Sequence, residues 1–439
     1  MRTAAAGGTT PTVDDAPTPR TGSRADRTAQ TRERIVRAAA ETFIAQGYRA
    51  TSLRDIAAAA DLSHPGLLKH FRTKDELLMA VVDVFEDRNE AALALEVEQA
   101  EGGALLFEVL AERNDRTPGY LPLFAALAGE ASNPSHPAHA HMRERYRRIV
   151  SFAADGLAEA VDHDLVSADR DPVGEAVRLS AAWDGLQVLS QYLPDRISIP
   201  SALAARQDDL ALPVGWIPLE DPEPRAAASA MPGVEPLVPA EAGVAAGYRT
   251  GRERRARILA DASALFAQEG YGDTSLRDLA ERVGVSKSAL LHHFPTKEAL
   301  LGEVLLERDR RVDAMITNPV TGRAVDDLRA LPAGAAHSSE HEPGLVELYA
   351  VLSCEAVPSE HTAHDYFVRR FGTALASFTA LFRAAQADGD LPSHRDPESE
   401  AIWLVALWDG LQYQWLYDHD GVDIGAHLAA HLADVLPER

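Results

Sequence analysis

Hydrophobic residues return every three to four positions along most of the chain, which is the spacing of helices that bury one face. Near the start, Ile35, Ala39 and Phe43 share one such face, and Gly47 follows where a glycine commonly ends a helix. Runs that alternate polar with β-branched or aromatic residues, as strands do, are missing from the sequence. The pattern therefore predicts an all-α protein.

The same pattern occurs twice. A shift of 223 residues aligns Gly47 with Gly270, and a shift of 225 aligns Trp-Asp-Gly-Leu-Gln at 183–187 with the same five letters at 408–412. Solenoid repeats are much shorter, so we expect one domain-sized unit present in two tandem copies. Seven prolines between residues 213 and 247 exclude a continuous helix there. This segment is long enough, as a linker, to let the copies lie side by side.

Each copy contains two short amphipathic helices joined by a tight turn. Ser52 and Asp55 have the spacing of a capping box, and Ser63 can cap the second short helix. The turn between them holds Asp61 in one copy and Gly284 in the other, residue types that tolerate a left-handed backbone. This is helix-turn-helix geometry, in which the second helix lies in the major groove of DNA.

A lysine stands in the first turn of the next expected helix in both copies, at Lys74 and Lys297, after the expected caps Thr73 and Thr296. A cation there opposes the helix dipole by roughly 0.3–1 kcal/mol. A DNA phosphate at this helix end would offset that cost, whereas the simpler alternative is a lysine that points into water.

The charge distribution fits a nucleic-acid partner although the net charge is −24. Residues 24–74 hold ten Lys and Arg against five Asp and Glu, and residues 249–297 hold nine against six. The chain therefore has two basic segments, and the rest of it is acidic. The acidic remainder would repel DNA and keep non-specific binding low.

In these segments each copy resembles the tetracycline-repressor-like (TetR) family of transcriptional regulators. The rest of each copy is only compatible with the family. The resemblance is specific over Thr51–Ala57, Leu67–Phe71 and Thr73–Leu77 in the first copy, and over Thr274–Ala280, Ala289–Phe294 and Thr296–Leu300 in the second. It implies all-helical subunits that work as homodimers, with a larger domain in which a small molecule releases the DNA. We therefore expect double-stranded DNA and a small-molecule effector as partners.

The resemblance also implies positions of DNA contact. These are Ser52, Ser63, His64, Lys69, His70 and Lys74 in the first copy, and Ser275, Ser286, Lys287, Ser288, His292, His293 and Lys297 in the second, with Arg54 and Arg277 as phosphate contacts. Leu68 and Leu291 depart from the family, because leucine cannot donate the hydrogen bond that an aromatic residue commonly makes there. Pro65 and Gly66 are poor in a helix interior, so the first recognition helix is expected to be short or to settle on DNA.

The residues at 183–187 and 408–412 stand inside apolar helical runs, where a glycine is costly unless backbones approach closely. The resemblance implies a dimer interface, here between the first and second copies; two chains pairing to give four reading heads is the alternative. Asp184 and Gln187 share a face that lines either a ligand pocket or a solvated stripe. The expected interface or pocket residues are Trp183, Asp184, Gly185, Gln187, Trp408, Asp409, Gly410 and Gln412.

Paired histidines, His136 with His139 and His361 with His364, have helical spacing. Zinc usually takes three or four protein ligands, and no cysteine stands nearby, so we expect no metal and no cofactor. A polar entry to a helix, or a pocket wall, is the simpler interpretation.

We predict a sequence-specific regulator, a repressor by resemblance, that reads two half-sites and releases them on binding a ligand; a scaffold with one decayed reading head is the alternative. The chain lacks a Gly-rich phosphate loop, a nucleophile elbow and an HExxH motif, so an enzyme is not expected. A single cysteine and the lack of long apolar runs predict a soluble cytoplasmic protein without membrane contact.

The expected organisation is a disordered tail at 1–24, helix-turn-helix domains at 25–73 and 248–296, ligand and dimerisation domains at 74–212 and 297–439, and a linker at 213–247, packed as an intramolecular pseudo-dimer.

Overall fold

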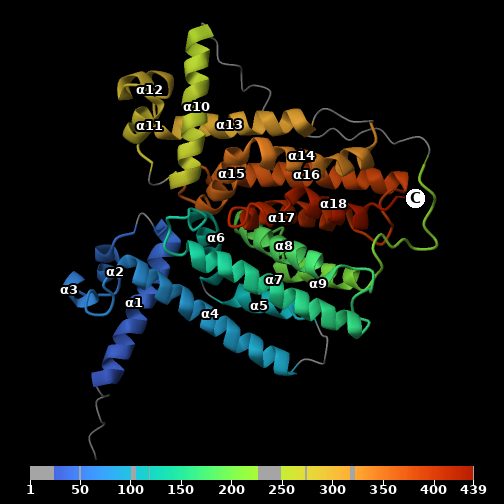
Figure 1. Ribbon diagram of the computed structural model, residues 1–439, viewed down its shortest axis with the longest axis horizontal. Helices are drawn as coiled ribbons and strands as arrows, with labels where there is room; N and C mark the ends of the chain where they lie inside the picture. The colour runs from blue at the N-terminus through green and yellow to red at the C-terminus, as the bar shows by residue number, and fades with distance from the viewer. Residues whose placement is uncertain are drawn as a thin grey trace, which may run out of the picture.

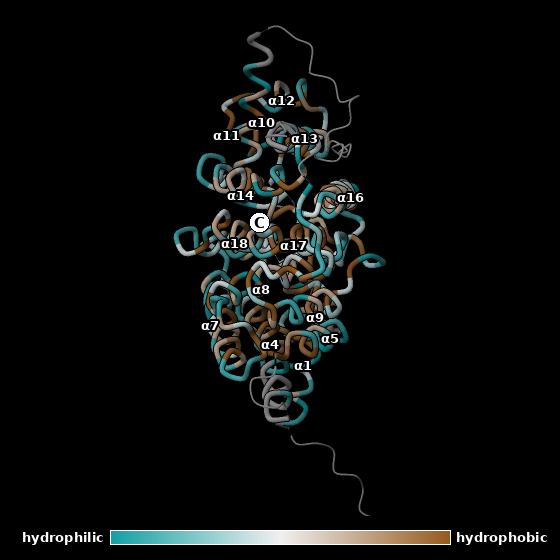
Figure 2. Tube along the Cα trace, turned by 90° about the vertical axis from the view of Figure 1, so that its right-hand side faces the viewer, coloured by the Kyte–Doolittle hydropathy of each residue, from teal (hydrophilic) through white to brown (hydrophobic). Residues whose placement is uncertain are grey.

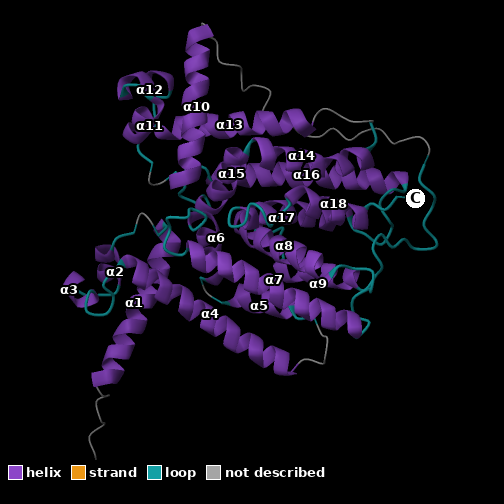
Figure 3. Ribbon diagram, in the orientation of Figure 1, coloured by secondary structure: helices purple, strands orange, loops and turns teal. Residues whose placement is uncertain are grey.

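The computed structural model describes residues 24–48, 51–99, 105–117, 119–225, 249–271, 274–316 and 322–438. All regular elements within these ranges are helices, and none of the described residues lies in a strand (Figure 3). The predicted all-α class is confirmed. The predicted disordered tail up to residue 23, and the predicted linker from residue 226 on, lie outside the described residues. None of the described helices is long and apolar enough to cross a membrane.

The two copies form two units of similar helix order. The first unit contains α1 (Arg24–Gln46), α2 (Leu53–Ala59), α3 (His64–Leu67), α4 (Lys74–Gln99), α5 (Phe107–Arg116), α6 (Tyr120–Glu130), α7 (His139–Asp162), α8 (Pro172–Tyr192) and α9 (Ile199–Leu210). The second unit contains α10 (Arg249–Glu269), α11 (Leu276–Val283), α12 (Lys287–His293), α13 (Lys297–Ile316), α14 (Ala324–His341), α15 (Pro343–Glu355), α16 (His364–Asp388), α17 (Pro397–Trp415) and α18 (Ile424–Val435).

The short helices begin and end as the sequence predicts. Capping boxes open α2 at Ser52 and α11 at Ser275, where each hydroxyl accepts a backbone N–H. Asp61 and Gly284 have positive φ angles of 52° and 72°, which turn the chain sharply into the next helix. Both helix-turn-helix motifs are therefore formed by local interactions within the motif.

The two units pair through their late helices, with α8 against α17 and α6 against α15 (Figure 1). A Cβ on Gly185 would overlap the backbone of Ala406, and a Cβ on Gly410 would overlap the backbone of Ala181. These two contacts are related by the shift of 225 residues, so the interface has two-fold pseudo-symmetry. One chain thus forms an intramolecular pseudo-dimer.

Two buried tyrosines strengthen this interface with a second pseudo-symmetric pair of contacts. The hydroxyl of Tyr192 donates to the carbonyl of Ser353 at 2.6 Å, and that of Tyr417 donates to the carbonyl of Ala128 at 3.0 Å. Because each hydroxyl is hydrogen-bonded, its burial costs little free energy. Because each bond crosses to the other unit, the two bonds also fix the register in which the units pair.

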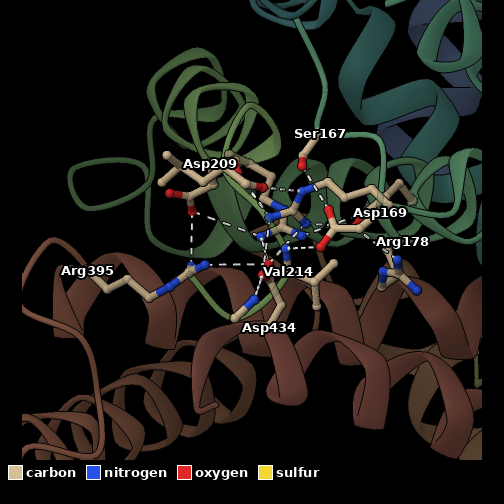
Figure 4. A network of polar contacts seen from close by, with 12 residues as sticks. Ser167, Asp169, Arg178, Asp209, Val214, Arg395 and Asp434 are labelled. Carbon is tan, nitrogen blue, oxygen red and sulfur yellow. Dashed lines mark hydrogen bonds and ion pairs between the residues drawn. The ribbon is translucent and has the colours of Figure 1, made fainter. Parts of the chain in front are cut away.

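A buried charge cluster joins the units at the far end of the interface (Figure 4). It consists of Arg170, Glu175, Arg178, Arg206 and Asp209 from the first unit, and Arg395, Glu400 and Asp434 from the second. Asp434 Oδ1 lies 3.1 Å from Arg170 Nη2, and its Oδ2 lies 3.0 Å from Arg206 Nη1. Arg395 Nη1 lies 3.1 Å from Asp209 Oδ2, which reproduces the Arg170–Asp434 contact across the pseudo-two-fold axis.

Both helix-turn-helix units lie on the left in Figure 1, at the two ends of the side opposite the C-terminus. Figure 2 shows the two units stacked, with α8 and α17 between them. In each unit, the remaining helices form a body that contacts the helix-turn-helix motif through a carboxylate at the end of α6 or α15. The backbone N–H of Tyr48 donates to Glu130 Oε2 at 2.9 Å, and that of Tyr271 donates to Glu355 Oε2 at 2.8 Å.

Candidate nucleic-acid interface and ligand cavity

The second helix of the helix-turn-helix motif differs between the units. In the first unit α3 has four residues, whereas α12 in the second has seven. Pro65 and Gly66 stand in α3 where Ser288 and Ala289 stand in α12, and the expectation of a short first recognition helix is confirmed. The second unit therefore presents the longer continuous helix.

Most side chains expected at the DNA are at the surface. The exposed ones are Ser52, Arg54, Ser63, Lys69, Ser275, Arg277, Ser286, Lys287, Ser288 and His292, and the half-buried ones are His64, His70, Lys74, His293 and Lys297. Four of the serine hydroxyls also accept a backbone N–H at a helix start, namely those of Ser52, Ser63, Ser275 and Ser286. These serines therefore contribute to the fold as well as to the surface.

The two first-turn lysines have partners inside the protein. Lys74 Nζ donates to the carbonyls of Tyr48 and Thr51, each at 2.8 Å, and lies 4.3 Å from the centre of the Tyr48 ring. Lys297 Nζ lies 4.1 Å from the centre of the Tyr271 ring. These contacts explain how a cation is accommodated in the first turn of α4 and of α13. The phosphate contact stays a prediction.

An arginine on the first helix of each unit supports the recognition helix, a role that our sequence reading missed. Arg32 lies over the Phe71 ring at 4.1 Å and donates to the carbonyl of His70 at 3.3 Å. Arg255 lies over the Phe294 ring at 5.0 Å. The aligned spacing of Arg32 and Arg255 in the repeat is the signal that would have found them.

The body of the first unit contains a cavity of about 360 Å³ between α4, α5, α7 and α8. Its walls are mostly apolar and include Phe107, Leu110, Ile149, Phe152 and Trp183. Asp184 and Gln187 both line it, so in the first unit their shared face borders a pocket rather than forming a solvated stripe. A largely apolar cavity with few polar groups is typical of a small-molecule site.

Several polar atoms of this cavity have no hydrogen-bond partner within the protein's described residues. Arg113 Nη1, Asn114 Oδ1 and Trp183 Nε1 have no hydrogen-bond partner among the described residues, and Asn114 is only 5% exposed. Burial raises the pKa of Asp184 to about 6, against the opposing effects of Arg145 and the Tyr146 hydroxyl. Unpaired buried polar atoms are costly, and a ligand that bonds them would remove the cost.

The corresponding residues of the second unit line none of the described cavities. Asp409 and Gln412 are buried, Trp408 is half-buried, and Gly410 lies at the crossing with α8. Burial raises the pKa of Asp409 to about 6, opposed chiefly by Arg370. The same five-residue sequence therefore borders a cavity at 183–187 and is packed against other side chains at 408–412.

The paired histidines have structural contacts. His136 lies 4.8 Å from the Tyr48 ring, and His361 lies 5.3 Å from the Tyr271 ring, where body and helix-turn-helix meet. His139 is stacked on Tyr417 of the other unit at 5.5 Å. Among the described residues, no three His, Cys, Asp or Glu side chains are grouped as a metal site requires.

Comparison with known proteins assigns the family. Residues 35–81 and 258–304 both match the bacterial regulatory proteins of the tetR family, and residues 324–437 match the C-terminal region of BetI-type transcriptional repressors. The HTH-type transcriptional repressor KstR2 of Rhodococcus jostii is 40% identical over 178 residues, covering 35% of this chain and 79% of that repressor. The HTH-type transcriptional repressor DhaR of a Mycobacterium species is 24% identical over 156 residues, covering 36% of this chain and 79% of that protein.

Among solved structures, Salmonella enterica GusR is 26% identical, with a TM-score of 0.35, covering 42% of this chain and 95% of GusR. The two matches to the N-terminal domain coincide with the two helix-turn-helix units described above. The chain therefore belongs to the tetR family of bacterial regulatory proteins, as a DNA-binding transcriptional regulator built from two tandem copies.

Proposed function

We propose that the protein represses transcription by binding one DNA site whose two halves differ, with α3 reading one half and α12 the other. Two of the relatives are named transcriptional repressors, which supports repression rather than activation. At equal positions the two recognition segments carry unlike residues: His64, Pro65, Gly66 and Lys69 against Lys287, Ser288, Ala289 and His292. Identical subunits read palindromes, whereas these two heads favour an asymmetric site.

The buried charge cluster is the observation that carries this proposal. Counting its side chains at full ionisation, the first unit contributes three arginines and two carboxylates, and the second contributes one arginine and two carboxylates. The first half is therefore positive by one charge, the second is negative by one charge, and the pair is neutral. Burial of unequal charge is strongly unfavourable, so unlike units pair best.

The asymmetry arises at two positions of the repeat. His431 stands in the second unit where Arg206 stands in the first, and Trp403 stands where Arg178 stands. Burial and the nearby Arg206 hold the pKa of His431 well below its ordinary value, so its ring is neutral. Two first units paired together would bury two surplus positive charges, and two second units two surplus negative ones.

The DNA contacts of this proposal follow the positions implied by the family resemblance. Arg54, Lys74, Arg277 and Lys297 would bind phosphates, which position the protein without reading sequence. The remaining predicted contact residues of α3, α12 and their flanks would meet base edges: His64, Lys69 and His70 in one half-site, and Lys287, Ser288, His292 and His293 in the other. The four capping serines would add phosphate contacts through their hydroxyls.

Ligand control is the second part of the proposal. Tyr120 lines the cavity at the start of α6, and Glu130 at the end of the same helix holds the N–H of Tyr48 beside the first helix-turn-helix unit. The Tyr48 hydroxyl also donates to Asp75 on α4. A ligand that displaces Tyr120 would tilt a rigid helix whose other end positions α1, and so change the separation of the two reading heads.

Selection of bound sequences from a random DNA pool by the full chain tests this function. We expect one enriched site with two unlike half-sites at fixed spacing, in which Lys69→Ala relaxes one half and Lys287→Ala relaxes the other, by ~1–3 kcal/mol at the contacted base. A palindrome would instead indicate two chains with one active head each. The absence of any enriched sequence at low salt would favour the scaffold alternative.

A further inference from the structure

We propose that the chain senses its effector in one unit only: the first-unit cavity binds a small aromatic molecule carrying one carboxylate, while the second unit fills the same position with its own side chains. This inference rests on the ligand control proposed above. It concerns how many effector sites the pseudo-dimer has, where the site lies, and which chemistry it accepts.

The two positions correspond through the internal repeat. The shifts of 223 and 225 residues place Asp309 at the position of Glu86, Tyr349 at that of Phe124, Arg370 at that of Arg145, and Asp409 at that of Asp184. Glu86, Arg145 and Asp184 line the first-unit cavity. Asp309, Arg370 and Asp409 line neither this cavity nor the two further cavities described below.

The second unit closes this position with a buried polar network. Arg370 Nη1 donates to the Tyr349 hydroxyl at 3.0 Å, and Arg370 Nε donates to Asp309 Oδ1 at 3.3 Å. The Tyr349 hydroxyl in turn donates to Asp409 Oδ2 at 3.3 Å. Tyr349 is 1% exposed, Asp309 2% and Asp409 8%, so little room is left for a ligand.

Specific substitutions between the units account for the difference. Phe124 has no hydroxyl to bridge its arginine and aspartate as Tyr349 does, so Arg145 donates to the Tyr120 hydroxyl at 3.1 Å instead. The contact of Arg145 with Glu86 at 3.3 Å matches that of Arg370 with Asp309. Asp184 is then left beside the cavity. In addition Phe378, at the position of Ala153 in the cavity wall, brings a whole ring into the second unit.

The cavity wall indicates the chemistry of the ligand. Three arginines and two carboxylates line it, namely Arg113, Arg145, Arg148, Glu86 and Asp184, which leaves one positive charge in excess. Arg113 Nη1 and Trp183 Nε1 are donors without a partner among the described residues, and an oxygen anion is the natural acceptor for both. The apolar remainder of the wall, rich in aromatic side chains, suits an aromatic body.

Two other cavities of the described residues differ in place and character. One of about 640 Å³ lies between α10, α13 and the start of α15, beside the second helix-turn-helix unit. One of about 830 Å³ lies between the units and is lined by the loop after α6, the end of α10 and the end of α17. Neither occupies the position related to the first-unit cavity by the repeat.

Isothermal titration of the full chain with naphthalene-2-carboxylate tests the proposal, with neutral 2-naphthalenemethanol as the matched probe. We expect one site per chain, and at least tenfold weaker binding of the neutral probe. Ala153→Phe copies the second unit into the first cavity and should abolish binding. The mirror variant Phe378→Ala is its control and should leave the affinity for the carboxylate within twofold, with the thermal transition of both variants followed by calorimetry.

Two sites per chain, equal affinity for the two probes, binding that survives Ala153→Phe, or no binding of either probe would each overturn the inference. The same variants are assayed on the selected DNA, which separates this inference from the proposed function. If naphthalene-2-carboxylate binds once per chain but leaves the DNA affinity unchanged, the site stands and ligand control of DNA binding fails. If wild-type protein binds no DNA, the titration remains interpretable by itself.

Discussion

The two units share one scaffold but differ at both ends that matter for regulation. The first unit has a cavity and a recognition helix of four residues, whereas the second joins the corresponding side chains in a buried network and has a recognition helix of seven. In a homodimer any change in one subunit appears in both. Fusion of two copies in one chain removes that constraint, so each copy can specialise while the shared interface keeps them paired.

The interface is the feature on which the whole comparison depends, and breaking it should have the largest effect. Gly185→Leu would drive a side chain into the backbone of Ala406, and we expect a loss of about 3 kcal/mol or more in the free energy of unfolding. Gly410→Leu should behave alike because of the pseudo-symmetry. Denaturant unfolding measures both losses.

The control for these variants is Gly156→Leu, since a Cβ at Gly156 meets nothing within 4 Å and that position is exposed on α7. It should leave stability unchanged or slightly raised. Equal losses at all three glycines would mean that close approach of α8 and α17 is not what these residues provide.

The buried charge cluster should give the next largest effect. Asp434→Asn removes one of the two buried carboxylates that pair with Arg170 and Arg206, which leaves excess buried positive charge at a cost of about 3–5 kcal/mol. Glu398→Gln removes a surface ion pair with Arg196 and should cost about 0–1 kcal/mol. Chemical denaturation of the two variants side by side measures the contrast, and similar small losses would contradict a tightly coupled cluster.

The cluster also predicts acid sensitivity. Burial alone would raise the pKa of Glu175, but Arg206, Arg178 and Arg170 lower it to about 2. A carboxylate with a lowered folded-state pKa contributes stability that is present above its ordinary pKa and is lost as the pH falls through the folded-state value. Stability should therefore decline between about pH 4.5 and pH 2, and less steeply in Glu175→Gln.

A smaller effect concerns the pH dependence of ligand binding, which should be confined to the first unit. Asp184, with its pKa raised to about 6, loses its charge as the pH falls from about 8 to about 5. Naphthalene-2-carboxylate should then bind several-fold more tightly, because one negative charge leaves the cavity wall. Arg145 and Tyr146 on α7, and Cys354 and Tyr417 of the second unit, are ionisable groups that interact with Asp184.

Titration calorimetry at several pH values measures this effect. Asp184→Asn should remove the pH dependence, while Asp409→Asn in the filled second unit should leave it intact. A pH dependence that follows Asp409 would place the site in the wrong unit.

The smallest predicted effect comes from exchanging one residue, Gly66 against Ala289, between the two recognition helices. Gly66→Ala should lengthen α3 and stabilise it by up to ~1 kcal/mol, with the nearby Ser63 hydroxyl shifting by a few tenths of an ångström. The matched swap Ala289→Gly should shorten α12 by the same mechanism. Amide hydrogen exchange over residues 68–70 and 291–293 reports both changes, and unchanged protection in both variants would show that this position does not set helix length.

Local patterns made much of the fold predictable from the sequence. The capping boxes at Ser52 and Ser275 and the left-handed turns at Asp61 and Gly284 depend on neighbours within a few residues. The duplicated glycines at 185 and 410 indicated a close helix crossing because a glycine inside an apolar helix needs a reason. The internal repeat then supplied the pairing of the two units.

Features that depend on distant residues were beyond this reading. The partners of Lys74 are carbonyls brought near by the fold, so a first-turn lysine alone could not distinguish them from a phosphate. The open and filled cavities differ through Phe124 against Tyr349 and Ala153 against Phe378, which are ordinary core substitutions along the sequence. Only their packing around a shared arginine and aspartate gives them opposite consequences.

The central claim is that one chain is a complete dimer with two unlike reading heads. Mass measurement of the native complex, formed between the full chain and the DNA duplex obtained by selection, tests it most directly. We predict one chain per duplex carrying two unlike half-sites, at protein concentrations well above the dissociation constant. Two chains on a palindromic duplex would contradict the claim, because the reading heads would then be paired between chains.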